Sequence, residues 1–393
     1  YNLYPSNIRL PTSDFQSPTS NPMPTTALKH IEYLSVKTGP RGSTTPKEKE
    51  GHEYVRKVLN GLGCAPRMET YQSRTSTYTP FILGLGLVLL AEILYWLIGR
   101  TADAQMGALA ALVISLAAFI SLLLELLGND NPLRWLVPTA PSQNVIGVTA
   151  ARDETKQKVA VMAHVDSHRT PLFFRTPVTF AAYRALTTLA LVGLAALCVM
   201  YAIAIFAPGG ALHTYSHIPA AVILLAWLMV VQAHYTPFAA GANDNASGVG
   251  VMLSLAERLK QKPLANTEVW WVATGCEEVG AYGSLDFVQR YADEFDEGAL
   301  IIVDNIAGKD TGPVYLDREG IVAPVKYPAE MLELANQIAA QNPKLGGRVI
   351  SQQGAYTDGY YALKAGLNVL TFVGYRKDGW IPNWHNPTDV FAN

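Results

Sequence analysis

The hydrophobic pattern is dominated by four long apolar runs. They are Phe81–Gly99, residues 106–128, Ala185–Phe206 and Ile218–Ala233. The first run contains one charged residue, Glu92, and as a helix it extends roughly 28 Å, close to the thickness of a bilayer's hydrocarbon core. We therefore predict four transmembrane helices. A buried core helix is the alternative for each run, and it has real weight only for the shorter fourth run.

Short connections between the runs predict that the four helices form two antiparallel hairpins. RTADAQ joins the first two runs and APGGALHTYSH joins the last two. We assign hairpin 1 to residues 81–128 and hairpin 2 to residues 179–235. Because a hairpin returns the chain to the side that it left, the polar parts of the chain should all lie on one side of the membrane.

The remaining sequence alternates between short β-rich apolar strands and helices with one apolar face. The expected strands are residues 144–149, 158–162, 267–274, 300–303 and 368–373, and the expected helices are residues 27–36, 48–64, 247–259, 282–291 and 329–341. This alternation predicts an α/β domain with a largely parallel sheet, interrupted by the two hairpins. Residues 1–26, rich in Pro, Ser, Thr and Asn, are expected to form an extended N-terminal arm.

Composition and charge fit a membrane protein and give no reason to expect nucleic acid as a partner. Charged residues make up 16% of the chain and the net charge is -2, whereas about 25% charged residues is usual in soluble domains. Of three cysteines, Cys198 lies inside an apolar run, which leaves at most one possible pair. Three free buried thiols are the simpler expectation, and the redox compartment is not decided.

Acids and histidines gather where the predicted strands end. They are His164 and Asp166 in AHVDS, Asp244 in GANDNASG, Glu277 and Glu278 in GCEEVG, Asp304 in LIIVDN, and His385 in NWHNPTD. Taken singly, each has an ordinary explanation as a core histidine, a solvated turn or a helix N-cap. In open α/β sheets, however, ligands bind beyond the carboxyl ends of the strands, so we expect these side chains to converge on one crevice.

Converging carboxylates require a positive charge among them. They repel one another and cost several kcal/mol each to desolvate when nothing balances them. The five motifs themselves contain no Lys or Arg. A pair of metal ions is the simplest counter-charge, and ligands of His and carboxylate type without Cys suit two Zn²⁺, with Co²⁺ or Mn²⁺ as alternatives.

The motifs HVD, NDNASG, CEE, VDN and WHNPTD, in this order, resemble those of the M28 aminopeptidases, which are di-zinc metallopeptidases. The resemblance implies a three-layer α/β/α catalytic domain with a central, mostly parallel mixed sheet. That domain would comprise residues 27–80, 129–178 and 236–393, with the two hairpins inserted into it. The chain would then be a membrane-embedded variant of the family.

The resemblance also implies a role for each residue. His164 and Asp304 would hold one metal, Glu278 and His385 the other, Asp244 would bridge both, Asp166 would orient His164, and Glu277 would be the general base. The implied activity is that of a membrane-anchored metallo-exopeptidase. It would bind a peptide with a free N-terminus and hydrolyse the first peptide bond with a metal-bridged water.

Two departures from the family pattern leave alternatives open. Hairpin 2 stands between Asp166 and Asp244, where soluble members have a short connector. Trp384 occupies a position where some members have a carbonyl-polarising Tyr, for which Tyr375 is a candidate, and Asp358 is expected to shape the pocket. The alternatives are a glutaminyl-cyclase-like acyltransferase with one zinc and a non-catalytic membrane subunit. Both metal half-sites are complete, which favours hydrolysis.

Two observations bear on which side of the membrane the catalytic domain occupies, and they point to opposite sides. The spans are flanked on the domain side by Arg74, Arg134, Arg175 and Arg184, and the positive-inside rule then favours the cytoplasm. Members of the resembled family are commonly exported, and on that ground we expect the extracytoplasmic side. The sequence gives no oligomeric state.

Overall fold

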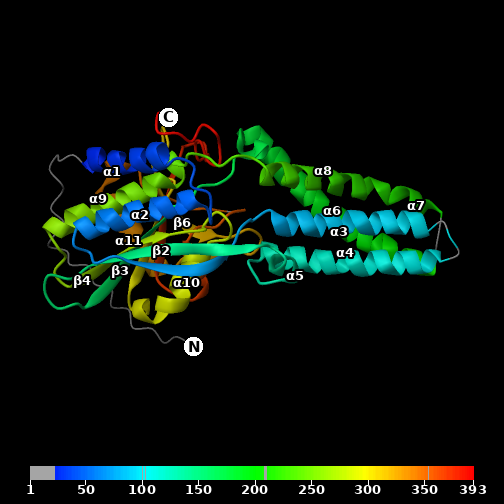
Figure 1. Ribbon diagram of the computed structural model, residues 1–393, viewed down its shortest axis with the longest axis horizontal. Coiled ribbons are helices and arrows are strands. Elements are labelled where there is room, and N and C mark those ends of the chain that lie inside the picture. The colour runs from blue at the N-terminus through cyan, green and yellow to red at the C-terminus, as the bar shows by residue number, and fades with distance from the viewer. Residues whose placement is uncertain (1–22, 100, 102, 208–209, 353) are drawn as a thin grey trace.

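The computed structural model describes residues 23–99, 101, 103–207, 210–352 and 354–393, and shows an α/β domain from which a bundle of long helices projects on one side (Figure 1). The expected N-terminal arm lies almost entirely outside the described residues. Its last four positions belong to helix α1 (Met23–Glu32), which therefore begins earlier than the sequence pattern indicates.

A mixed sheet forms the middle of the domain. Its strands are β1 (Arg67–Arg74), β2 (Thr139–Thr149), β3 (Gln157–His164), β4 (Thr267–Thr274), β5 (Ala299–Asp304), β6 (Gly312–Glu319), β7 (Val325–Lys326), β8 (Arg348–Ser351) and β9 (Val369–Tyr375). The order is β1-β2-β4-β3-β5-β9-β6-β7, with β8 paired to β6. The four central strands, β4-β3-β5-β9, are mutually parallel, and β2 and β6 flank them in antiparallel pairing. The expected sheet is thus confirmed, with its parallel part at the centre.

The sequence pattern missed β1, β6, β7 and β8, and the reason is their place in the sheet. β1 reads RMETYQSR and is mostly half-exposed, so it has neither a continuous apolar run nor clear alternation. An edge or near-edge strand is defined by its backbone pairing, here with β2, and that pairing leaves little mark on the side chains.

Helices cover both faces of the sheet (Figure 1). One face carries α1, α2 (Pro46–Gly61), α9 (Gly248–Gln261) and α11 (Ala329–Gln341), and the other carries α10 (Tyr282–Tyr291) and α12 (Gly359–Lys364). Leu34, Val55 and Met252 pack with Trp271 of β4 on the first face, whereas Phe287 packs with Met162 of β3 on the second. The domain is therefore the three-layer α/β/α structure that the sequence predicts.

Within the described residues, four helices are long and apolar enough to cross a membrane. They are α3 (Thr79–Ile98), α4 (Ala104–Leu126), α6 (Pro177–Phe206) and α8 (His217–His234), the last extended by α7 (Ala211–Tyr215). Large apolar side chains face outward, with Ile93, Val113 and Val192 between 54% and 61% exposed. A soluble protein rarely shows such an apolar surface. The shorter fourth run gains its length from the α7 residues that precede it.

Both acids inside the apolar runs have partners. Glu92 of α3 accepts hydrogen bonds from the Tyr201 hydroxyl at 2.7 Å and the Ser216 hydroxyl at 2.8 Å, and His217 Nδ1 lies 2.8 Å away. These partners come from hairpin 2, so the contact joins the two hairpins. Glu125 forms a bidentate ion pair with Arg134, which lies just beyond the end of α4.

Replacing Glu92 by Ala is expected to lower the stability of the helix bundle by about 1–3 kcal/mol, because two buried hydroxyls lose their acceptor. Glu92→Gln, which keeps one acceptor oxygen, should cost less. The measurement is thermal unfolding of the purified protein in detergent micelles, with the exposed Glu50→Ala of α2 as control. An unchanged melting temperature in Glu92→Ala would contradict this role.

Candidate active site

The loop between α8 and α9 brings Asp244 to the centre of the site. Gly241 has a φ of +64°, and a Cβ on Gly248 would lie 2.2 Å from the Val303 carbonyl oxygen. Only glycine allows such a close approach between the start of α9 and the end of β5. Asn245 completes the junction, because its side chain donates to that carbonyl and accepts from the backbone N–H groups of Gly248 and Asn305. The small residues of GANDNASG therefore let Asp244 lie beside His164 at the end of β3 and close to the end of β5.

Asp244 lies between two groups of potential metal ligands. His164, the last residue of β3, places Nε2 3.3 Å from Asp244 Oδ1 and 3.3 Å from Asp304 Oδ1. On the other side, His385 Nε2 lies 3.1 Å from Asp244 Oδ2 and 3.2 Å from Glu278 Oε2. The structure thus brings together all five residues that the sequence predicts as ligands, and Asp244 is the one that faces both groups.

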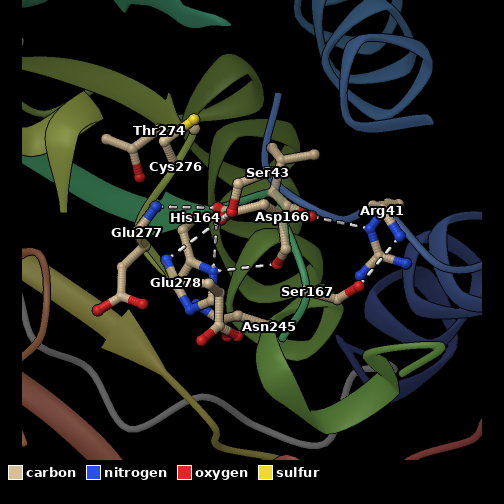
Figure 2. A network of polar contacts seen from close by, with 12 residues as sticks. Arg41, Ser43, His164, Asp166, Ser167, Asn245, Thr274, Cys276, Glu277 and Glu278 are labelled. Carbon is tan, nitrogen blue, oxygen red and sulfur yellow. Dashed lines mark hydrogen bonds and ion pairs between the residues drawn. The ribbon is translucent and has the colours of Figure 1, made fainter. Parts of the chain in front are cut away.

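Asp166 lies behind His164 and joins the ends of two strands (Figure 2). Its carboxylate accepts the backbone N–H groups of Glu277 and Glu278, each at 3.2 Å, and the Ser43 hydroxyl at 2.6 Å. His164 Nδ1 lies 3.1 Å from the Asp166 carbonyl oxygen and 3.6 Å from its carboxylate. Asp166 therefore fixes both the imidazole and the turn that carries the two glutamates.

The protein groups alone leave the site short of positive charge. Burial raises the pKa of Glu278 well above its ordinary value, and the charge of Asp244 adds to the shift. Burial also raises the pKa of Glu277, which His164 opposes and Glu278 reinforces. Burial by itself lowers the pKa of His164, but hydrogen bonds to Asp166, Asp244 and Asp304 raise it well above normal. A bound cation would relieve this cost of burying several carboxylates together.

A second observation supports the binding of a pair of metal ions by these side chains. Glu278 Oε1 is buried and has no hydrogen-bond donor among the described residues, although a buried carboxylate oxygen without a donor is costly. Among the described residues, three groups of three have ligand atoms close enough to share an ion: His164 with Asp244 and Asp304, His168 with Glu278 and His385, and His164 with Glu277 and Glu278. Oxygen and imidazole ligands in groups of this size suit Zn²⁺.

The ligand groups open into a pocket whose wall includes Glu277, Trp384 and Tyr356. Tyr375, considered from the sequence as a carbonyl-polarising residue, instead has its hydroxyl 3.1 Å from Gln352 Oε1. Asp358 is buried behind the pocket and accepts the Thr274 hydroxyl, so it supports the end of β4.

Several residues that support the site were missed in the sequence. Asp389 accepts the backbone N–H groups of Asn243 and Asp244. Glu48 accepts the Cys276 N–H beside the two glutamates, and burial raises the pKa of Glu48 to about 8. Arg41 is fully buried and donates to five backbone carbonyls, including those of Val165 and Gly241. Asp389 ends the WHNPTD motif, but like Arg41 and Glu48 it acts on a segment remote in sequence, so its partners could not be read from the motif. All three cysteines are free and buried.

The C-terminal part of the chain matches a known protein family. Residues 226–393 match the family described as Peptidase family M28. Aminopeptidase YwaD of Bacillus subtilis is 42% identical over 69 residues, which is 17% of this chain and 15% of that protein. The alkaline phosphatase isozyme conversion protein of Escherichia coli is 32% identical over 138 residues, 33% of this chain and 39% of that protein. The matches thus span less than half the length of these relatives.

Solved structures support the fold over most of the chain. A zinc aminopeptidase from Bacillus subtilis superposes with a TM-score of 0.55 at 15% identity, covering 94% of this chain and 89% of that one. A glutaminyl cyclase from Porphyromonas gingivalis gives a TM-score of 0.53 at 14% identity, covering 94% and 90%. At such identities the likeness concerns the fold alone, and it includes proteins of two different activities.

Proposed function

We propose, from the match of residues 226–393 to peptidase family M28, that this chain is a membrane-anchored, zinc-dependent aminopeptidase. The observation that carries the proposal is the pair of complete ligand groups on either side of Asp244. A glutaminyl-cyclase-like reaction at one zinc would leave one of these groups without a purpose. A non-catalytic subunit would have no need for either group.

In this proposal, each ligand group holds one ion. His164 and Asp304 would hold the first, Glu278 and His385 would hold the second, and Asp244 would be shared by both. When bound, two zinc ions would supply the positive charge that polarises the scissile carbonyl and makes a water molecule acidic near neutral pH.

Glu277 is the proposed general base. Its neighbour Glu278 faces His385, whereas Glu277 lines the pocket and is left free of the ligand pairs around Asp244. A carboxylate in that place can take a proton from the attacking water and pass it to the leaving amine. Tyr356 lines the same wall, and burial raises its pKa well above normal, so its hydroxyl stays protonated near neutral pH.

The proposed function is tested with purified protein, zinc and a set of short peptides. We expect release of the N-terminal residue from free peptides and amino-acid amides, no cleavage of the same peptides after N-acetylation, and two zinc ions per chain. Formation of a lactam from N-terminal Gln peptides with one zinc per chain would support the cyclase instead. Absence of both reactions in a zinc-loaded protein would support a non-catalytic subunit.

We also propose that hairpins 1 and 2, residues 81–128 and 179–235, are membrane inserts in a catalytic domain made of residues 27–80, 129–178 and 236–393. Supporting this, the pocket wall includes Thr77, two residues before α3. Trp384 of the same wall packs against Phe180 in the first turn of α6. The pocket would therefore open close to the lipid surface.

This position predicts a dependence on peptide length. In lipid nanodiscs, peptides of about 20 residues should be cleaved more slowly than tripeptides with the same first residue, because the bilayer obstructs the longer chain. In detergent micelles the difference should become smaller. Equal rates for both lengths in both environments would contradict a pocket at the lipid surface.

We propose that the catalytic domain lies on the extracytoplasmic side of the membrane. This proposal follows the family resemblance, although the distribution of arginines favours the cytoplasm. Protease treatment of sealed, right-side-out vesicles should then degrade the domain and leave the hairpins. Full protection of the domain would place it in the cytoplasm.

A further inference from the structure

The imidazoles of the two ligand groups are held in different ways. His164 has its Nδ1 near the carbonyl oxygen and the carboxylate of Asp166, the usual arrangement in which the second ring nitrogen of a metal-binding histidine is hydrogen-bonded. His385 directs Nε2 at Asp244 and Glu278. Its Nδ1 is buried and has no hydrogen-bond partner among the described residues. On the Nδ1 side, the orientation of the His385 ring is therefore not fixed by a hydrogen bond from a described residue.

Three neighbouring rings surround His385. The His168 ring stacks on it with centroids 3.6 Å apart and an interplanar angle of 18°. Phe174 meets it edge to face at 4.5 Å and 82°, and Trp384 lies at 4.6 Å. A stacked ring on one side and a perpendicular ring on another leave the imidazole little freedom to rotate. Ring packing thus restricts the orientation of the His385 imidazole, whereas hydrogen bonding at Nδ1 restricts that of His164.

Two of these rings come from the segment that leads into hairpin 2. His168 and Phe174 lie between β3 and α6, and both are buried. His168 is held in turn by its own neighbourhood, since Nδ1–H donates to the Arg169 carbonyl at 2.8 Å and Nε2 lies 3.3 Å from the hydroxyl of Tyr78. Tyr78 directly precedes α3 of hairpin 1. The rings against His385 are therefore anchored at the starts of both hairpins.

We propose that His168 and Phe174 are positioning residues that set the ring of His385 and thereby the affinity of the second metal position. This inference rests on the two-metal site of the proposed function. It assigns the membrane-proximal segment a part in metal binding. The position at His385 would depend on the hairpin entries, whereas the position at His164 and Asp304, the last residues of β3 and β5, would not depend on these rings.

A direct ligand role for His168 is the competing explanation, since its ligand atom lies near those of Glu278 and His385. The stacking argues against it. A histidine binds a metal through a lone pair in the plane of its ring, and two parallel rings stacked face to face do not direct these lone pairs at one point. The ring of His168, and not its nitrogen, is therefore the element that matters.

The test compares four variants of the full chain in nanodiscs, dialysed against buffers of fixed free Zn²⁺. His168→Ala and Phe174→Ala remove a ring from His385, whereas His168→Phe keeps a ring and removes the nitrogens. Phe173→Ala is the matched control, because Phe173 is equally buried beside Phe174 but stacks on Tyr183. Zinc per chain is measured by mass spectrometry, and the two positions are compared through the visible spectrum of the Co²⁺ form.

We expect wild type, His168→Phe and Phe173→Ala to retain two ions. His168→Ala and Phe174→Ala should bind the second ion about 10–100-fold more weakly, as on loss of an orienting partner, while retaining the first. The retained first ion shows that the chain is folded. Should either truncation unfold the chain, Phe174→Leu keeps most of the volume and gives the same comparison.

Three results would overturn the inference. One is loss of the second ion in His168→Phe to the same degree as in His168→Ala, which would make His168 a ligand. Another is equal loss in Phe173→Ala, which would reduce the effect to general packing. The third is retention of both ions in all variants. Failure of the proposed aminopeptidase would show separately, as a zinc-loaded wild type that hydrolyses no peptide.

Discussion

Replacing Glu277 by Gln is expected to reduce peptide hydrolysis by a factor of about 10²–10⁴, the usual contribution of a general base. The amide has nearly the shape of the carboxylate but cannot accept a proton from water. Because Glu277 lies outside the ion pairs that join Asp244 to the histidines, zinc content and melting temperature should remain those of the wild type. The measurement is the steady-state rate on an amino-acid amide together with zinc per chain.

Measuring the metal content distinguishes a general base from a metal ligand at Glu277. The ligand atoms of Glu277, His164 and Glu278 are close enough to share an ion, so Glu277 has a second possible role as a ligand. A variant that loses activity together with one zinc would assign it that role. A variant as active as wild type would remove Glu277 from the chemistry altogether. Glu53→Gln, on the exposed side of α2, controls for the loss of one negative charge.

Replacing Asp244 by Ala is expected to empty both metal positions, because its two carboxylate oxygens face the two histidines separately. Hydrolysis should fall below detection, and zinc per chain should fall from two to fewer than one at free Zn²⁺ concentrations that saturate wild type. Asp304→Ala, which removes a ligand from the His164 side alone, should retain one ion. Mass spectrometry of dialysed protein measures both.

The comparison between these two aspartates tests the bridge itself. If Asp244→Ala and Asp304→Ala each lose a single ion, Asp244 belongs to one position and does not join them. Asp153→Asn, in an exposed ion pair with Arg152, should retain both ions and full activity. Loss of zinc in this control would mean that the decrease reflects surface charge and not a ligand.

Some parts of the structure follow from local sequence because their cause is local. The apolar runs that form α3, α4, α6 and α8 are long enough to be recognised by themselves, and the buried strands β3, β4, β5 and β9 are continuous and β-rich. Parallel strands end at one edge of a sheet, so residues that follow them must meet. For this reason His164, Glu278 and Asp304, which end or follow β3, β4 and β5, were predictable as neighbours before any coordinates.

Other parts were not predictable, since their partners lie far away in the chain. β1 and β6 became strands through pairing with β2 and β9, not through their own composition. Glu48 reached the turn before Glu277 only because α2 packs on the sheet. Tyr375 had the right chemistry to polarise a carbonyl, but its side chain turned to Gln352.

The sequence by itself thus determined which residues have the chemistry of metal ligands and which segments are long and apolar enough to cross a bilayer. Both properties are set by residue type and spacing. Only the tertiary structure decided how the ligands are held. The His168 and Phe174 rings rest on His385 because the segment entering hairpin 2 folds back over the loop that carries it. Such contacts join residues more than 200 positions apart, and their geometry depends on packing that no single segment encodes.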